Sequence, residues 1–309
     1  VYMIACDHVH VLYYIWLPDK TGEDVARALM RAAARGVTCR AIADGLGSRA
    51  LLRAPLWQEM RKAGVQTAIA LPLDRPIHTL LTSRIDLRNH RKITVIDGTI
   101  TYCGSRNSAD PEFRVKAKYA PWVDIMLRFE GPVVVQNQLL FLSDWMQATG
   151  EPFDTFNVFW PPVTDGFPAQ VLGDGPTERQ GATPQLFATL ISAARTELTL
   201  TTPYFVPDAI VLAALCAAAY RGVKVTLIFP QRNDSWIVAA ASRSYYETLL
   251  EAGCDIYEFQ GGLLHAKTLT IDGLVTLVGS SNLDLRSFDL NFENNILLQD
   301  VSVTEAVFK

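Results

Sequence analysis

The chain has 309 residues and a formal net charge of −4, and 49% of its residues are hydrophobic and 19% charged. This length allows two domains of about 150 residues with sizeable cores, while the acidic balance argues against a protein that grips nucleic acid with its whole surface. Five scattered cysteines, without a C-x-x-C pair, predict neither a disulfide framework nor a zinc site.

Taken in chain order, the expected elements of the first half alternate between strands and helices. They are a strand over 11–16, an Ala-rich helix ending at Arg35-Gly36, a strand over 37–43, a helix over about 48–63, a strand over 65–71 and a hairpin that starts at 90. Gly36 suits the left-handed residue that closes a helix, and Asp97-Gly98 predicts the hairpin turn. A helix over about 131–147 and a Pro- and Phe-rich connection over 151–168 follow.

The same order returns in the second half. It has a strand over 197–205, an Ala-rich helix ending at Arg221-Gly222, a strand over 223–229, a helix over about 236–252, a strand over 254–259 and a hairpin from 265. The runs YIWLPD (14–19) and PYFVPD (203–208) match as well. Because strands alternate with helices, we expect an α/β fold. It should consist of two tandem α/β/α sandwich domains with mixed sheets, 1–150 and 151–309, related by a pseudo-two-fold axis.

Each half contains the motif H-x-K-x4-D-G-x5-G-S-x-N, as HRKITVIDGTITYCGSRN from His90 and HAKTLTIDGLVTLVGSSN from His265. Side chains i and i+2 of a strand share a face, so His90 lies beside Lys92 and His265 beside Lys267. If both copies converge on one site, one histidine can attack phosphorus while the other protonates the leaving alcohol. The lysines then stabilise charge on the equatorial oxygens, and we expect no metal and no cofactor.

Four further motif positions are expected to bind phosphate. Ser105 and Asn107 share one strand face, as do Ser280 and Asn282, and each pair offers a hydroxyl and an amide to an anion.

Two aspartates complete the motif. Asp97 and Asp272 belong with the catalytic residues by motif membership, but each lies seven residues after its histidine. This odd offset points them away from the histidine face, which favours a turn-forming or supporting role.

A reactive histidine needs an acceptor on its second ring nitrogen to fix the tautomer. By parallel placement in the two halves, we expect Asp124 to orient His90 and Glu293 to orient His265. The other histidines (His8, His10 and His78) are interpreted as structural or exposed, although His8 and His10 would share a strand face.

The motifs, together with LRNHRKITVIDG, TPYFVPD and SNLDLRSFDLNFEN, resemble the phospholipase D (HKD) superfamily and, within it, bacterial cardiolipin synthases. The resemblance implies transfer of a phosphatidyl group between phosphatidylglycerol molecules through a phosphohistidine, with release of glycerol. It implies His90 as nucleophile and His265 as general acid. The phosphate would be held by Lys92, Lys267, Asn107 and Asn282.

The implied substrate is a phospholipid at a membrane surface. A basic cluster (Arg84, Arg88, Arg91 and Lys92) could attract its headgroup or pair with neighbouring acids. An aromatic group (Phe153, Phe156, Phe159 and Trp160) could enter lipid, but core packing is favoured. The resemblance further implies the cytoplasmic face of a bacterial inner membrane. Because the chain begins at Val1, we expect an anchoring N-terminal segment outside it.

Three alternatives stay open at this stage. The same residues could serve a phospholipase D that transfers to water or another alcohol. A metal-independent nuclease is disfavoured by the acidic balance, and no nucleic acid partner is expected. A catalytically dead scaffold is disfavoured because both motifs are intact. The oligomeric state is left open.

Overall fold

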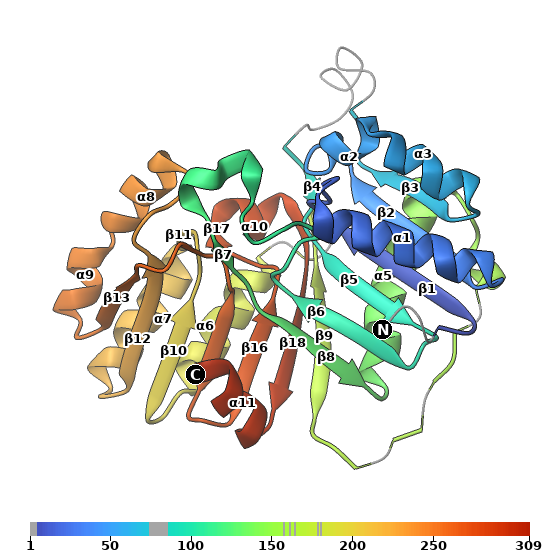
Figure 1. Cartoon of the computed structure of the whole chain (residues 1–309). Coiled ribbons are helices and arrows are strands. Elements are labelled where there is room, and N and C mark those ends of the chain that lie inside the picture. Colours follow the sequence, from blue (N-terminus) through green and yellow to red (C-terminus); the bar gives the residue numbers. More distant parts are fainter. Residues whose placement is uncertain are drawn as a thin grey trace. The chain divides into compact units, whose positions relative to one another are not determined.

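The computed structural model describes residues 5–73, 86–156, 158–160, 162–163, 165–177, 179 and 181–309 (Figure 1). The chain forms two compact units, and each contains a piece of the other's sequence half. The first unit comprises Val1–Asp110 and Met126–Gly166, and the second comprises Pro111–Ile125 and Phe167–Lys309. The division therefore differs from the expected boundary at 150/151, since Pro111–Ile125 joins the second unit and the later crossing falls after Gly166.

The first unit is built on a mixed sheet with the strand order β3-β2-β1-β5-β6-β8. Its strands are β1 (His8–Tyr13), β2 (Thr38–Asp44), β3 (Gln66–Ala70), β5 (Lys92–Ile96), β6 (Ile100–Gly104) and β8 (Met126–Glu130). The short β4 (Arg88–Asn89) precedes β5 in the chain and is not a strand of this sheet. Strands β1, β2 and β3 are parallel, whereas β5, β6 and β8 continue the sheet antiparallel.

Helices cover both faces of this sheet. They are α1 (Lys20–Ala34), α2 (Arg49–Arg53), α3 (Pro55–Lys62) and, on the opposite face, α5 (Val133–Thr149) (Figure 1). Buried residues such as Val11, Leu29 and Trp57 form the core beneath the first three helices. A second core beneath α5 includes Val95 and Phe141.

The second unit repeats this plan. Its sheet runs β13-β12-β10-β15-β16-β18, and β9 pairs with β18. The strands are β9 (Ala169–Asp174), β10 (Glu197–Thr201), β12 (Lys224–Pro230), β13 (Asp255–Phe259), β15 (Thr268–Ile271), β16 (Val275–Gly279) and β18 (Asn291–Gln299). The helices are α6 (Ala182–Ala193), α7 (Ala209–Tyr220), α8 (Trp236–Arg243), α9 (Tyr246–Glu251), α10 (Leu285–Asp289) and α11 (Val301–Phe308). The predicted α/β fold of two repeated units with mixed sheets is confirmed.

The described residues also include two short strand pairs and two 3₁₀ helices. In the second unit, β7 (Trp122–Val123) pairs with β14 (Leu263–Leu264), and β11 (Phe205–Val206) pairs with β17 (Leu283–Asp284). The 3₁₀ helices are η2 (Arg114–Tyr119) and η3 (Phe153–Thr155). Pairing of β7 with β14 explains why Pro111–Ile125 belongs to the second unit.

The repeated Pro-Asp pair has a local structural reason. Asp19 is the N-cap of α1 and accepts a hydrogen bond from Gly22 N–H, and Asp208 caps α7 by accepting from Ile210 N–H. At the other helix ends, Gly36 and Gly222 have φ values of 89° and 87°, which glycine adopts without strain. The repeat therefore encodes matching helix boundaries in both units.

The helix expected over 48–63 is two helices, α2 and α3. The break falls at Ala54-Pro55, because proline restricts the residue before it to extended backbone and lacks an N–H. The helix expected over 236–252 is likewise divided, into α8 and α9.

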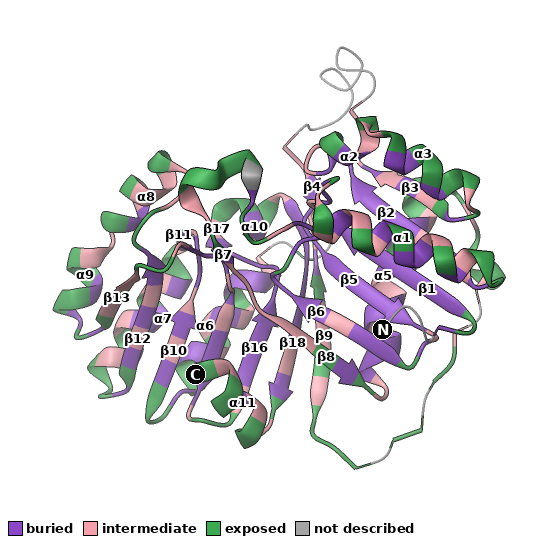
Figure 2. Ribbon diagram, in the orientation of Figure 1, coloured by how far each residue is buried: buried purple, intermediate pink, exposed green. Residues whose placement is uncertain are grey.

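Figure 2 shows that the buried residues follow the two sheets. His8 and His10 are both buried, with His10 stacked on Phe141 and His8 paired with Asp7, in line with their structural interpretation; His78 lies outside the described residues. Across the described part of the chain, no helix combines the length and apolarity that a membrane span needs.

Candidate active site

The two histidine-lysine pairs have the same local geometry. His90 precedes β5, whose first residue is Lys92, and His265 and Lys267 lie between β14 and β15. All four side chains are buried, with Lys92 0% and Lys267 4% exposed. In each unit the lysine ammonium donates to the carbonyl oxygen of the histidine two residues earlier. Since a buried ammonium is costly unless compensated, the histidine carbonyl offsets part of the desolvation cost of each lysine.

The surroundings of Lys267 determine its charge. Burial lowers the pKa of Lys267 to about 8, although the carboxylates of Asp124 and Glu293 raise it. At neutral pH the Lys267 side chain is therefore mostly in its charged ammonium form. Asp284 lies in the same cluster, and burial raises its pKa to about 6.

Asp124 is the carboxylate that orients His265. Its Oδ1 lies 2.5 Å from His265 Nδ1, and His265 N–H donates to the carbonyl oxygen of Val123 at 2.8 Å. The ring of Trp122 lies 4.5 Å from the imidazole, between centroids. With Nδ1–H donating to Asp124, Nε2 is the nitrogen available for chemistry.

The expectation that Asp124 orients His90 is therefore wrong. The expectation that Glu293 orients His265 is wrong as well, because Asp124 contacts Nδ1 of that histidine. Parallel placement in sequence failed because β7 carries Asp124 into the second unit. Glu293 accepts hydrogen bonds from Ser280 Oγ and from Asn291 Nδ2 in its own unit.

The motif serines and asparagines are buried, but they differ in what they offer. Ser280 donates its hydroxyl to Glu293 and accepts from Asn294 N–H, so its proton is already committed. Asn107 Oδ1 accepts from Ile15 N–H, and its Nδ2 has no partner among the described residues. Asn107 Nδ2 thus remains able to donate to an acceptor, whereas the Ser280 hydroxyl supports the framework. Ser105 is completely buried.

Asn282 is held by a residue that sequence reasoning missed. Both its backbone N–H and its Nδ2 lie 3.2 Å from Ser287 Oγ, and Asp284 accepts from Ser287 N–H at 2.7 Å. The run SNLDLRSFD contains an N-cap signal in Asp284, but no local pattern indicates the contact of Ser287 with Asn282.

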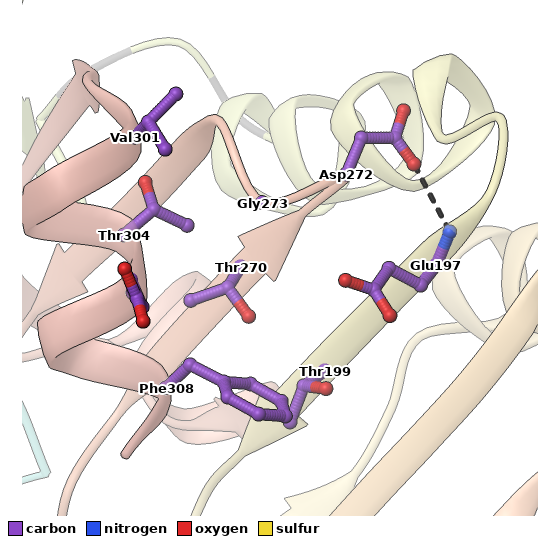
Figure 3. Close-up of a pocket in the computed structure, with 9 residues that line it drawn as sticks. Glu197, Thr199, Thr270, Asp272, Gly273, Val301, Thr304 and Phe308 are labelled. Carbon is purple, nitrogen blue, oxygen red and sulfur yellow. Dashed lines mark hydrogen bonds between the residues drawn. The ribbon is translucent and has the colours of Figure 1, made fainter.

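The two motif aspartates hold the far ends of the hairpins. Asp97 accepts from the backbone N–H groups of Cys6, Asp7 and His8. Asp272 accepts from those of Arg195, Thr196 and Glu197, as Figure 3 shows for Glu197. Asp97 and Asp272 adopt left-handed φ values of 52° and 51°, which aspartate tolerates in turns. These contacts replace their motif-based catalytic assignment with a structural one.

Replacing Asp272 with asparagine should therefore destabilise the fold and spare the chemistry. Burial tends to raise the pKa of Asp272, but hydrogen bonds from Glu197 and Thr196 outweigh it and lower the pKa. The stabilisation is present above the unfolded carboxyl pKa and is lost as pH falls through the lowered folded value. We expect a loss of about 1–3 kcal/mol in the free energy of unfolding at neutral pH, measured with urea, and convergence with the parent at acidic pH. An equal loss at both pH values would contradict this role.

Two arginines of the basic cluster are held in buried ion pairs. Arg88 pairs with Asp44 and Arg91 with Asp144, and the side chains of both arginines are 3% exposed. These buried ion pairs hold the chain that leads to His90. Arg84 lies outside the described residues.

A cavity of about 190 Å³ lies at the Asp272 end of the second sheet (Figure 3). Strand β15 separates Asp272 from Lys267, a distance of about 16 Å for five extended residues. The cavity thus takes no part in chemistry at His265. Within the described ranges, no three His, Cys, Asp or Glu side chains are grouped as metal ligands.

Comparison with known proteins identifies relatives of this chain. A family model described as "Cardiolipin synthase, PLD-like domain" matches residues 4–120 and 187–309. Cardiolipin synthase A of Yersinia pseudotuberculosis and of Yersinia pestis are each 41% identical over 302 residues, which cover 96% of this chain. The chain spans 62% of the length of each of these relatives.

Two solved structures share the fold. Phosphatidylserine synthase of Haemophilus influenzae Rd KW20 has a TM-score of 0.69 at 14% identity, over 99% of this chain and 80% of that chain. Polyphosphate kinase of Porphyromonas gingivalis has a TM-score of 0.62 at 16% identity, over 99% of this chain and 42% of that one.

Proposed function

Because the chain belongs to the cardiolipin synthase, PLD-like domain family, we propose that it is a phosphatidyltransferase of the cardiolipin synthase type. It moves a phosphatidyl group from one phosphatidylglycerol to another and releases glycerol through a covalent phosphohistidine. The observation that carries the proposal is the pairing of a buried histidine with a desolvated lysine in each of two repeated units.

The chemistry needs two histidines that act on one phosphorus atom. A ring nitrogen of His90 attacks phosphorus, the bond to the glycerol oxygen breaks, and that oxygen takes a proton from His265 Nε2. The hydroxyl of a second phosphatidylglycerol then attacks the phosphohistidine and gives its proton to His265. The P–N bond breaks, cardiolipin leaves, and both histidines return to their starting states.

The lysines and Asn107 support the proposed transition state. Lys92 and Lys267 stabilise negative charge on the non-bridging oxygens, and the ammonium groups act strongly because they are desolvated. Asn107 Nδ2 supplies a neutral donor. The substrate lies at a bilayer, and the expected setting is the cytoplasmic face of a bacterial inner membrane.

Product analysis tests the proposal. The protein is incubated with phosphatidylglycerol vesicles in EDTA, and lipids and released glycerol are quantified. Cardiolipin and glycerol in equal amounts support transfer. Phosphatidic acid without cardiolipin would instead establish a hydrolase, and complete loss of activity in EDTA would refute a metal-free mechanism. Plasmid DNA incubated in parallel is expected to remain intact.

A further inference from the structure

Three large apolar side chains are exposed around the start of α8. Trp236 and Ile237, the first residues of this helix, are 79% and 62% exposed, and Val115 of η2 is 67% exposed. A tryptophan so exposed is unusual in a soluble protein unless it contacts something. We call Val115, Trp236 and Ile237, with the neighbouring cations Lys116, Lys118 and Arg232, the α8 surface.

The two parts of this surface are joined by polar contacts. Lys116 of η2 pairs with Asp234 just before α8, and Asp234 also accepts from Tyr204 OH at 2.6 Å. Asn233 Nδ2 donates to the carbonyl oxygen of Pro203 at 2.6 Å. These polar contacts therefore hold η2 and the start of α8, which carry the exposed apolar side chains, in place.

The α8 surface lies at the His265 end of the second unit. Thr201, at the end of β10, pairs with Thr268, the residue after Lys267. Because β12 is parallel to β10, the loop after β12 and the start of α8 leave the sheet at that same end. Figure 1 shows α8 and the green segment of η2 at one end of the sheet. From η2 the chain continues through Trp122 to Asp124 beside His265.

The charge around these side chains favours an anionic partner. Lys118 and Arg232 are exposed cations, whereas Lys116 is paired with Asp234 and Glu112 is a nearby exposed acid, although the whole chain carries a net charge of −4. Exposed tryptophan and aliphatic side chains beside cationic side chains are typical of protein surfaces that bind anionic membranes.

The aromatic connection after α5 is a weaker candidate. Phe153, Phe159 and Trp160 are 48%, 51% and 60% exposed, whereas Phe156 packs on the core and faces Arg40. Phe159 lies beside Gly98, at the hairpin turn and thus at the opposite end of β5 from Lys92. Trp160 therefore provides a matched exposed tryptophan distant from the histidine of its own unit.

We propose that the α8 surface rests on an anionic phospholipid bilayer and presents the His265 end of the second unit to the lipid headgroups. This proposal rests on the proposed function and specifies the lipid-contacting side chains. Trp236, Ile237 and Val115 enter the interface, and Lys118 and Arg232 contact acidic headgroups.

The test compares the Trp236→Ser/Ile237→Ser double variant with Trp160→Ser and the parent chain. Flotation with vesicles of phosphatidylglycerol and phosphatidylcholine measures binding, which does not depend on catalysis. The double variant is expected to bind roughly tenfold more weakly or worse, because apolar area no longer leaves water, while Trp160→Ser binds like the parent. Lys118→Glu should weaken binding about fivefold or more on anionic vesicles and leave binding to pure phosphatidylcholine unchanged.

Activity on short-chain phosphatidylglycerol below its micelle concentration separates the two proposals. The double variant should lose transfer on vesicles and keep it on this dispersed substrate. The lipid-binding role of the α8 surface would be overturned by any of three results: parent-like flotation of the double variant, an equal loss of vesicle binding in Trp160→Ser, or no vesicle binding by the parent chain. A parent chain that floats with vesicles but transfers nothing from dispersed substrate would overturn the proposed function alone.

Discussion

Replacing His90 with alanine is expected to abolish the covalent lipid-enzyme intermediate and to reduce transfer by about four orders of magnitude, because no other group then attacks phosphorus. The measurement uses phosphatidylglycerol radiolabelled in the phosphate, with quenching in SDS at alkaline pH and counting of the label on protein. The parent should retain label through an acid-labile P–N bond, and the variant should retain none.

A second substrate decides which histidine attacks. A phosphatidyl ester of p-nitrophenol has a leaving group that needs no proton, so formation of the intermediate no longer depends on a general acid. His265→Ala should then release a burst of p-nitrophenol and keep the label, whereas His90→Ala should show neither. The reverse pattern would make His265 the nucleophile.

Replacing Asp124 with asparagine is expected to lower kcat for phosphatidylglycerol by about two to four orders of magnitude. The 2.5 Å contact with His265 Nδ1 fixes the tautomer that leaves Nε2 reactive, and an amide cannot accept that proton and stabilise the imidazolium equally well. The variant should retain the p-nitrophenol burst, as His265→Ala does.

Asp7→Asn is the matched control, since Asp7 contacts His8 Nδ1 at 2.7 Å outside the motifs. It should leave both kcat and the burst unchanged. If Asp124→Asn loses the burst as His90→Ala does, Asp124 acts on the nucleophilic step and its role at His265 is not the important one.

The sequence was sufficient to predict the repeated unit and the local proximity of its histidine and lysine residues, because these depend on local rules. The i, i+2 spacing places Lys92 beside His90 and Lys267 beside His265, and both lysines contact the carbonyl of their histidine. Helix ends at Gly36 and Gly222 were likewise predictable from the need for left-handed backbone.

The features that the sequence did not predict depend on contacts between segments that are distant in the chain. Pairing of β7 with β14 takes Asp124 to His265, and no local pattern encodes this exchange. The same limit applies to Arg88 and Arg91, whose partners Asp44 and Asp144 lie more than 40 residues away. Because these partners are distant in sequence, local charge patterning could not decide whether the arginines bind a headgroup or form ion pairs.

The position of Pro111–Ile125 bears on how such a chain can evolve. A duplicated gene starts as two autonomous copies, and either copy can be lost without harm to the other. Here the first copy encodes the carboxylate that the second copy's histidine uses. A gene fission between codons 150 and 151 would leave the downstream polypeptide with an imidazole that lacks its proton acceptor. The two copies therefore share one structural element, and the second unit depends on a segment encoded within the first repeat.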